Sequence, residues 1–294
     1  MKITFLGTSA MLPTATRNHT AILLEYKQEG ILIDCGEGTQ KQLRLAKINP
    51  NKITKILITH FHGDHVLGIP GIIQNLSAHH YQSTLEIYIP KGTKKYLQRM
   101  LSGVIFAGKI PMKVVEVQPG VFYKSKEFTL KAAKLSHGVD CLGYLFIEQD
   151  KRKINLAYTK KFGLTQHPLL GKLQQGKTIT YEGKKITPAQ GTIKQPGKKI
   201  AFILDTKICK SAITLAKDTD LVIADATWLT DNKEKKGHHM TATEAAELAK
   251  KAKAKQLILT HFSQRYKENN EFEKEAKKVF KNVKAAEDFL TLTI

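Results

Sequence analysis

The chain has 294 residues, 41% hydrophobic and 25% charged, as in ordinary soluble globular proteins, and it is long enough for one large α/β domain or two modest ones. Its 47 lysines and arginines outnumber 26 acidic residues and give a formal net charge of +21. Such an excess indicates a polyanionic partner, with nucleic acid before an anionic membrane. The alternative is a generally lysine-rich surface that binds no partner.

The cysteines and the N-terminus give no indication of secretion. Cys35, Cys141 and Cys209 are far apart and form no CxxC pair, so they predict neither a disulfide framework nor a zinc knuckle. The opening MKITFLG is typical of a strand rather than of a signal peptide, and no apolar stretch approaches membrane-spanning length. We therefore expect a cytoplasmic protein with no membrane contact.

Short apolar segments repeatedly end on a polar side chain. In chain order, these predicted strands end at Asp34, His60, His137, Asp205, Asp225 and His261. Helical spacing follows in other segments, namely a short apolar helix after residue 65, 93–101, 243–254 with Thr241 or Thr243 as its cap, and 270–280. Strands interspersed with helices predict an α/β protein, whose ligands would bind at the carboxyl ends of the strands.

The segment THFHGDH (59–65) is the strongest local signal. His60 and His62, two residues apart on an extended segment, can reach one metal ion, and Asp64 and His65 can face a second. Each pair leaves coordination positions vacant, which the other strand ends could fill: His137 at the first ion, His261 at the second and Asp205 between them. Taken singly, those three residues would more often be structural, two as hydrogen-bonded histidines and one as a turn cap.

Residues 151–199 differ from the rest of the chain in composition. They contain twelve lysines and arginines against the single acid Glu182, and they are rich in Gly, Pro, Gln and Thr. We interpret this segment as an excursion from the core, an inserted arm at about 154–197 that grips phosphates. A solvated basic loop without a partner is the alternative.

Four segments together resemble one known family. FLGTSAMLPTATRN, LIDCGEGTQKQL, LSHGVDCLGYLF and LILTHFSQRY are similar to segments of ribonuclease Z in its short form, a tRNA 3′-processing endonuclease family of the metallo-β-lactamase superfamily. These segments are distributed along nearly the whole chain, from residue 5 to residue 266, and are much more specific than the histidine cluster, which many hydrolases share. The resemblance implies one metallo-β-lactamase domain over 1–294, an αββα sandwich with a projecting basic exosite arm.

The resemblance also implies roles for individual residues. His60, His62 and His137 would bind one zinc ion, and Asp64, His65 and His261 the other, with Asp205 bridging; Mn²⁺ or Fe²⁺ are alternatives to the two Zn²⁺. Asp64 would also accept a proton, and His239 would lie near the scissile phosphate, supported by Asp225. The expected RNA-binding residues are Arg17, Asn18, Lys172, Lys177, Lys184 and Lys185.

The implied function is removal of the 3′ trailer from precursor tRNA, leaving a tRNA 3′-OH and a trailer 5′-phosphate. The arm would belong to a homodimer in which one subunit holds tRNA for the active site of the other. Departures from the family pattern occur at Leu204, Asp225, Met240 and His167, and none of them removes a ligand.

Two alternatives remain open from the sequence. The first is a small-molecule phosphodiesterase or other hydrolase of the same superfamily, which would need neither the high charge nor the basic arm. The second is a non-catalytic RNA-binding module with a structural metal, which would leave RNA uncut.

Overall fold

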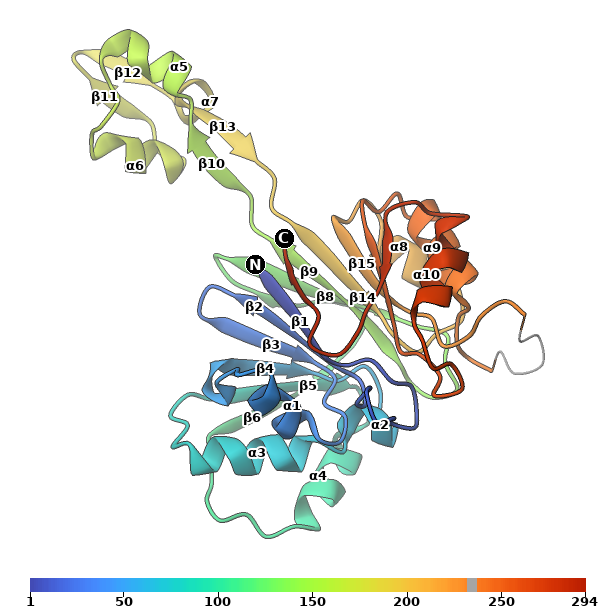
Figure 1. Cartoon of the computed structure of the whole chain (residues 1–294). Helices are drawn as coiled ribbons and strands as arrows, with labels where there is room; N and C mark the ends of the chain where they lie inside the picture. The colour runs from blue at the N-terminus through green and yellow to red at the C-terminus, as the bar shows by residue number, and fades with distance from the viewer. Residues whose placement is uncertain (232–236) are drawn as a thin grey trace. The chain divides into compact units, whose positions relative to one another are not determined.

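The computed structural model describes residues 1–231 and 237–294 (Figure 1). Two compact units can be distinguished. The larger comprises Met1–Tyr123, Leu130–Phe146 and Lys199–Ile294, and the smaller comprises Lys124–Thr129 and Ile147–Lys198. Among the described residues, no helix has the length and apolar character needed to cross a bilayer.

The larger unit is built on two seven-stranded sheets. In spatial order, the first sheet contains β18 (Thr291–Thr293), β1 (Lys2–Gly7), β2 (Ala21–Tyr26), β3 (Glu29–Ile33), β4 (Ile53–Leu57), β5 (Leu85–Pro90) and β6 (Met112–Val117). The second contains β17 (Val283–Ala285), β16 (Leu257–Thr260), β15 (Leu221–Asp225), β14 (Lys199–Ile203), β9 (Leu142–Glu148), β8 (Phe128–Lys134) and β7 (Gly120–Lys124). Strands β3 to β6 and β14 to β17 are each paired in parallel.

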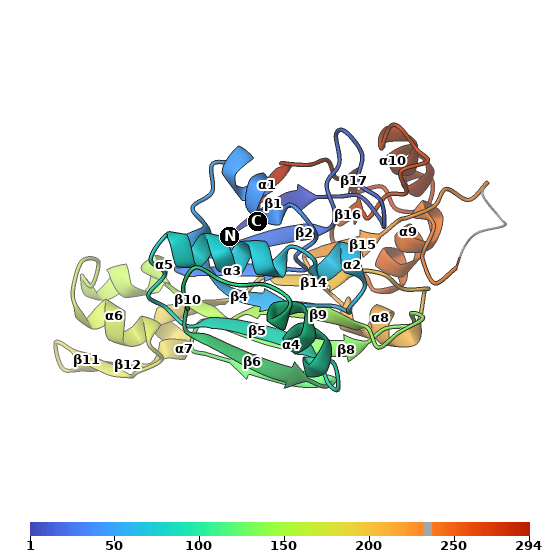
Figure 2. The same cartoon turned by 90° about the horizontal axis from the view of Figure 1, so that it is seen from below.

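Helices cover the outer faces of both sheets (Figures 1 and 2). Along the first sheet lie α1 (Thr39–Leu45), α3 (Ile69–Ala78) and α4 (Lys94–Ser102), with the short η1 (Pro50–Lys52) and α2 (Gly63–Val66) in its loops. Along the second lie α8 (Lys210–Leu215), α9 (Ala242–Lys251) and α10 (Asn270–Lys277). The architecture is the expected αββα sandwich of the metallo-β-lactamase fold.

The helices form where apolar residues recur at helical spacing. In α3, the buried residues are Ile69, Ile72, Ile73 and Leu76, one stripe that packs on the apolar core of the first sheet. In α9, Thr241 is the cap: its hydroxyl accepts a hydrogen bond from the Glu244 backbone N–H, and the Glu244 carboxylate accepts one from the Thr241 N–H. This reciprocal pair fixes which of the two candidate threonines begins the helix.

The smaller unit is a folded module rather than a loop. It contains an antiparallel pair, β10 (Lys151–Ile154) with β13 (Thr192–Gln195), and a hairpin of β11 (Ile179–Tyr181) and β12 (Lys184–Ile186). Its helices are α5 (Leu156–Thr159), η2 (Lys160–Phe162), α6 (Leu169–Gln174) and α7 (Pro188–Gly191). A small core consists of Leu164, Leu173, Ile179 and Ile186. The predicted arm at about 154–197 lies inside this unit.

Candidate metal centre and active site

Side chains from both sheets converge at the carboxyl ends of the strands. His60, His62, Asp64 and His65 follow β4, whereas His137 follows β8 and Asp205 and His261 follow β14 and β16. Their ligand atoms fall into overlapping groups within which all atoms lie less than 4.8 Å apart. All seven candidate ligands therefore meet at one place.

The spacing of the histidine nitrogens fits metal ions. His62 Nδ1 lies 2.9 Å from His60 Nε2 and 3.2 Å from His137 Nε2, and His65 Nε2 lies 3.3 Å from His261 Nε2. A tetrahedral zinc ion with nitrogens at about 2.0–2.1 Å holds two such nitrogens roughly 3.3 Å apart. The donors present therefore suit a divalent metal site.

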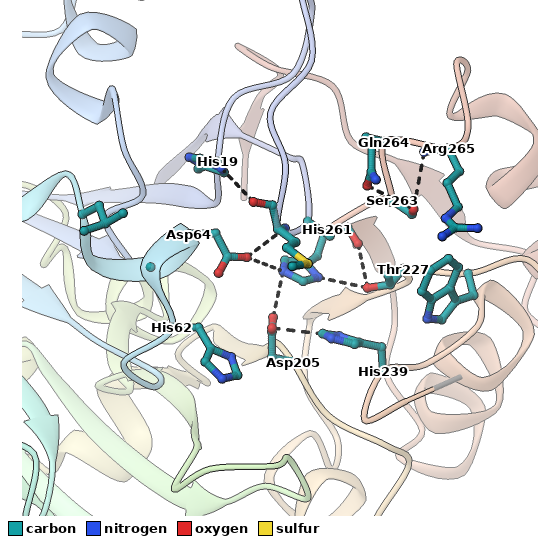
Figure 3. Close-up of a pocket in the computed structure, with 15 residues that line it drawn as sticks. His19, His62, Asp64, Asp205, Thr227, His239, His261, Ser263, Gln264 and Arg265 are labelled. Atoms are coloured by element: carbon teal, nitrogen blue, oxygen red, sulfur yellow. Dashed lines mark hydrogen bonds and ion pairs between the residues drawn. The ribbon is translucent and has the colours of Figure 1, made fainter. Parts of the chain in front are cut away.

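Asp205 lies between the two groups of ligands. Its Oδ2 is 3.7 Å from His60 Nε2 and 3.3 Å from His65 Nε2, and its Oδ1 is 3.1 Å from His261 Nε2. Figure 3 shows its carboxylate beside His261, with Asp64 across the same ring. Asp64 Oδ2 is in turn 3.3 Å from His65 Nε2 and 3.6 Å from His261 Nε2. The Asp205 carboxylate therefore faces both groups of histidines, whereas the Asp64 carboxylate faces only His65 and His261.

Burial favours the neutral form of two candidate ligands, His60 and His137. Because His60 is removed from solvent, its pKa is well below its usual value, and burial likewise lowers the pKa of His137 to about 4. Neutral imidazole is the form that binds a metal. Although burial opposes ionisation of Asp64, the neighbouring His65 and His261 lower its pKa, so the carboxylate is charged.

Buried partners orient two of the ligands from behind. Asp34 Oδ2 accepts a hydrogen bond from His65 Nδ1 at 2.7 Å and one from the Thr59 hydroxyl at 2.8 Å. The Thr227 hydroxyl lies 3.0 Å from His261 Nδ1 and donates to Asp225 Oδ1 at 2.6 Å. Each contact occupies the ring nitrogen that faces away from the ligand cluster, which leaves Nε2 free to bind an ion.

Three residues of the site adopt a backbone conformation that non-glycine residues seldom use. Asp34, Asp205 and His261 have φ angles of +56°, +48° and +62°. Left-handed conformations of this kind cost free energy and persist at functional sites when their surroundings enforce them. Here they aim each side chain from a strand end into the cluster.

His239 and Asp225 form a second pair beside the ligands. The His239 Nδ1 lies 2.9 Å from Asp225 Oδ2, so Nε2 is the nitrogen left for a substrate. Although burial opposes both shifts, this contact raises the pKa of His239, and His239 together with His261 lowers the pKa of Asp225 to about 2. The geometry is that of a histidine held by a buried carboxylate, which favours the protonated form of the ring.

The cluster opens into a cavity of about 530 Å³ (Figure 3). Besides ligands and His239, the lining includes residues that the sequence did not single out: Ala10, Met11, Leu67, Trp228, Ser263, Gln264 and Arg265. His19 also lines it and contacts the Met11 carbonyl at 3.1 Å. A signal existed for Trp228, because the chain's only tryptophan comes directly after a strand end and Thr227.

Arg17, one of the residues expected to bind RNA, has several partners within the protein. Its side chain is buried, and the guanidinium donates hydrogen bonds to Asn269 Oδ1 at 2.7 Å and to the carbonyls of Ser263 at 3.2 Å and Tyr266 at 2.7 Å. These contacts anchor the loop after β16. Half-buried Asn18 similarly donates to the Glu37 carbonyl at 2.7 Å.

The predicted RNA-binding lysines lie in the smaller unit. Lys172, Lys177, Lys184 and Lys185 are all exposed. Lys184 Nζ lies 4.8 Å from the centre of the Phe162 ring, a cation–π contact that positions its stem.

An αββα sandwich with seven candidate histidine and aspartate ligands at its strand ends defines a metal-dependent hydrolase. Family models described as "Anti-Pycsar protein Apyc1" and "Beta-lactamase superfamily domain" match residues 1–160 and 161–262. The chain is 40% identical to "Ribonuclease BN" of Cronobacter sakazakii over all of both chains. It is 37% identical to "Ribonuclease Z" of Methanothermobacter thermautotrophicus over all of this chain and 97% of that one.

A solved structure agrees with these relatives. The short form of human tRNase Z is similar with a TM-score of 0.72 and 29% identity, over 100% of this chain and 99% of that one. The chain belongs to the ribonuclease Z family. It is accordingly a metal-dependent hydrolase that acts as an endoribonuclease.

Proposed function

We propose that the protein is a cytoplasmic tRNA 3′-processing endonuclease, which removes the 3′ trailer from precursor tRNA and leaves a tRNA 3′-OH and a trailer 5′-phosphate. The observation that carries this proposal is the convergence of seven ligand side chains and His239 on one open cavity. Relatives named ribonuclease Z that match all of this chain support the choice of substrate. The net charge of +21 suits a polyanion.

Two divalent ions per subunit would be held by these ligands, zinc first, with Mn²⁺ or Fe²⁺ as alternatives. His60, His62 and His137 would hold one, and Asp64, His65 and His261 the other, with Asp205 shared. Ions at such a site lower the pKa of water and neutralise charge on a phosphodiester. Nitrogen and carboxylate donors at these spacings favour zinc over magnesium or calcium, which prefer oxygen.

The remaining steps fall to this chain's own side chains. Asp64 Oδ2 accepts a hydrogen bond from the Met11 backbone N–H at 2.9 Å, which fixes the carboxylate that would accept a proton from the attacking water. His239, held through Nδ1 by Asp225, would donate a proton from Nε2 to the departing 3′-oxygen. Asp225 thus acts through His239 and contacts no substrate.

Substrate affinity would come largely from the smaller unit. Its exposed Lys172, Lys177, Lys184 and Lys185 would bind tRNA phosphates, releasing counterions. A homodimer would let this unit of one subunit hold tRNA that the other cleaves. Half-buried Asn18 would contact RNA only through side-chain atoms that its hydrogen bond to the Glu37 carbonyl does not engage.

The decisive experiment is incubation of the purified protein with one 3′-extended tRNA precursor, followed by sequencing of both product ends. We expect a single cut that leaves a tRNA 3′-OH and a trailer 5′-phosphate, and no cut in EDTA. Cleavage that persists in EDTA would contradict the metal mechanism. Turnover of small phosphodiesters without any cleavage of precursor would instead identify a small-molecule hydrolase.

A further inference from the structure

The cavity combines a charged floor with apolar walls. Met11 and Leu67 line it with 74% and 53% of their surface exposed, unusual for large apolar side chains beside a site for phosphates. Trp228 lines it from the other sheet. Apolar and aromatic surface beside a phosphodiester site suits the parts of a nucleotide that carry no charge, its base above all.

Trp228 is held firmly by its backbone. Its N–H donates to the Met240 carbonyl at 3.4 Å, and its carbonyl accepts from the Ala242 N–H at 2.9 Å. The preceding Thr227 contacts His261, so the indole is one residue from the ligand cluster. The side chain is half-buried, yet its Nε1 is covered by protein and has no hydrogen-bond partner among the described residues. What the indole exposes is therefore ring carbon.

Arg265 supplies a cation at the same wall. Its side chain is exposed, and the guanidinium carbon lies 5.8 Å from the centre of the Trp228 ring. Figure 3 shows Arg265 on the side of the cavity where Thr227 and His239 lie, across His261 from His62 and Asp64. Proteins bind single-stranded nucleic acid through aromatic faces with adjacent cations: the base stacks on the ring and the cation binds the backbone phosphate.

We propose that Trp228 stacks on a nucleobase of the RNA, and that this base belongs to the nucleotide on the 5′ side of the cleaved bond. This assignment rests on the proposed function. His239 would protonate the departing 3′-oxygen, which belongs to that nucleotide, and His239 directly precedes Met240, the backbone partner of Trp228. Arg265 then binds a phosphate of the same strand. Met11 and Leu67 also line the cavity and would face the first trailer nucleotide.

The single tryptophan makes the stack directly observable, because all tryptophan emission comes from position 228. The probe is mature tRNA ending at the cleavage site, a product that binds without turnover, compared with the same tRNA lacking only its last base. We expect the intact tRNA to quench the emission on saturation and the abasic tRNA to leave it nearly unchanged. Equal quenching by both would overturn the proposal, even if precursor is cleaved.

Affinity provides the second test. Loss of one base–aromatic stack weakens binding by roughly 5- to 150-fold. Wild-type protein should bind the abasic tRNA more weakly within this range, Trp228→Phe should preserve the discrimination, and Trp228→Ala should bind both tRNAs equally. A Trp228→Ala protein that still discriminates would overturn the proposal. Bound metal per chain verifies that each variant is folded.

The position of the base is tested with cleavable precursors. Removing the base on the 5′ side of the bond should slow wild-type cleavage more than removing the base on the 3′ side. If removing the base on the 3′ side slowed cleavage more, Trp228 would not contact the nucleotide on the 5′ side, and the proposal would be contradicted. If no precursor were cleaved while intact tRNA still quenched the emission, the proposed processing function would fail and the stacking site would stand.

Discussion

Asp34 and His65 are joined by a hydrogen bond of 2.7 Å between two fully buried side chains, and the same carboxylate also accepts from the Thr59 backbone N–H and hydroxyl. All three donors need a carboxylate with two accepting oxygens. The ligand segment after β4 is thus tied to the end of β3. Asp34, which is not itself a candidate ligand, sets the orientation of the His65 ring.

Asp34→Asn should therefore weaken metal binding without removing a ligand. An amide offers only one accepting oxygen, so either His65 or Thr59 loses its partner. We expect affinity for zinc to fall about 10- to 100-fold, as for other partners of metal-binding histidines. Competition with a coloured chelator measures this. Wild-type affinity in the variant would show that the contact does not orient His65.

His62→Ala removes a candidate ligand outright. Because His62 Nδ1 lies close to both His60 and His137, its loss leaves the first ion with too few nitrogens. We expect no detectable precursor cleavage and less metal per chain by elemental analysis. His79→Ala, on an exposed histidine at the end of α3, is the matched control and should keep its metal. Unchanged metal in His62→Ala would remove this residue from the site.

His239→Ala separates proton transfer from metal binding. If His239 is a general acid, cleavage should slow by about 10²–10⁴-fold while metal content and tRNA affinity stay near wild type. The neighbouring exposed His238 gives a control, since His238→Ala should cleave at close to the wild-type rate. Loss of metal together with activity would make His239 a ligand instead.

The smaller unit can be shortened at a place that the strand pairing provides. Ile154 and Thr192 are opposite each other in the β10–β13 pair, so a short glycine linker can replace residues 155–191. The shortened protein should keep its bound metal and lose most of its tRNA affinity. The log–log salt dependence of binding should become shallower by about 0.7–0.9 for each phosphate that the shortened protein no longer binds. Equal affinity and equal slope in both proteins would contradict the role of this unit.

Replacing the four lysines without deleting the fold controls for misfolding. A combined substitution to alanine at Lys172, Lys177, Lys184 and Lys185 should shift the salt slope in the same direction while the circular dichroism spectrum is retained. If the deletion weakened tRNA binding and the four-lysine variant did not, the phosphate-binding residues would lie elsewhere in the smaller unit.

The raised pKa of Asp288 predicts that the stability of the fold depends on pH, independently of the metal ligands. It accepts hydrogen bonds from the Thr8 hydroxyl, the Asn18 N–H and the Gln42 amide, yet burial raises its pKa to about 6. An aspartate in the unfolded chain has a pKa of about 3.9. Between this pKa and that of folded Asp288, the folded protein binds more protons than the unfolded chain, so the free energy of unfolding falls as pH rises. Between pH 5 and pH 7 the loss amounts to about 1 kcal/mol.

Asp288→Asn abolishes this titration, and all other groups remain in both proteins. The free energy of unfolding, measured by urea denaturation at several pH values, should therefore fall more steeply from pH 5 to pH 7 in the wild type than in the variant. Parallel profiles would show that the Asp288 carboxyl titrates alike in folded and unfolded chains.

The class of fold and the place of the site were predictable because their signals are local. Histidines two residues apart after an apolar strand lie on the same side of the extended chain, so the strand alone brings them together. The parallel pairing of β14 to β16 brings Asp205 and His261 to the same edge of the sheet. The role of Arg17 was not predictable, since its partner Asn269 lies 252 residues away and only tertiary contact buries the guanidinium. The basic segment was expected as an arm, but its small core depends on apolar residues spread between charged ones.

Because His65 and His261 meet across 196 residues of chain, the second group of candidate ligands cannot assemble on the ribosome until nearly all of the polypeptide has emerged. The first half, released earlier, carries five of the seven candidate ligands, including His137, but lacks Asp205 and His261. An ion captured at that stage would be held weakly and exchange readily. We expect a nuclease assembled in this way to be inactive during its own synthesis, among ribosome-bound tRNAs, until β14 and β16 are in place in the second sheet.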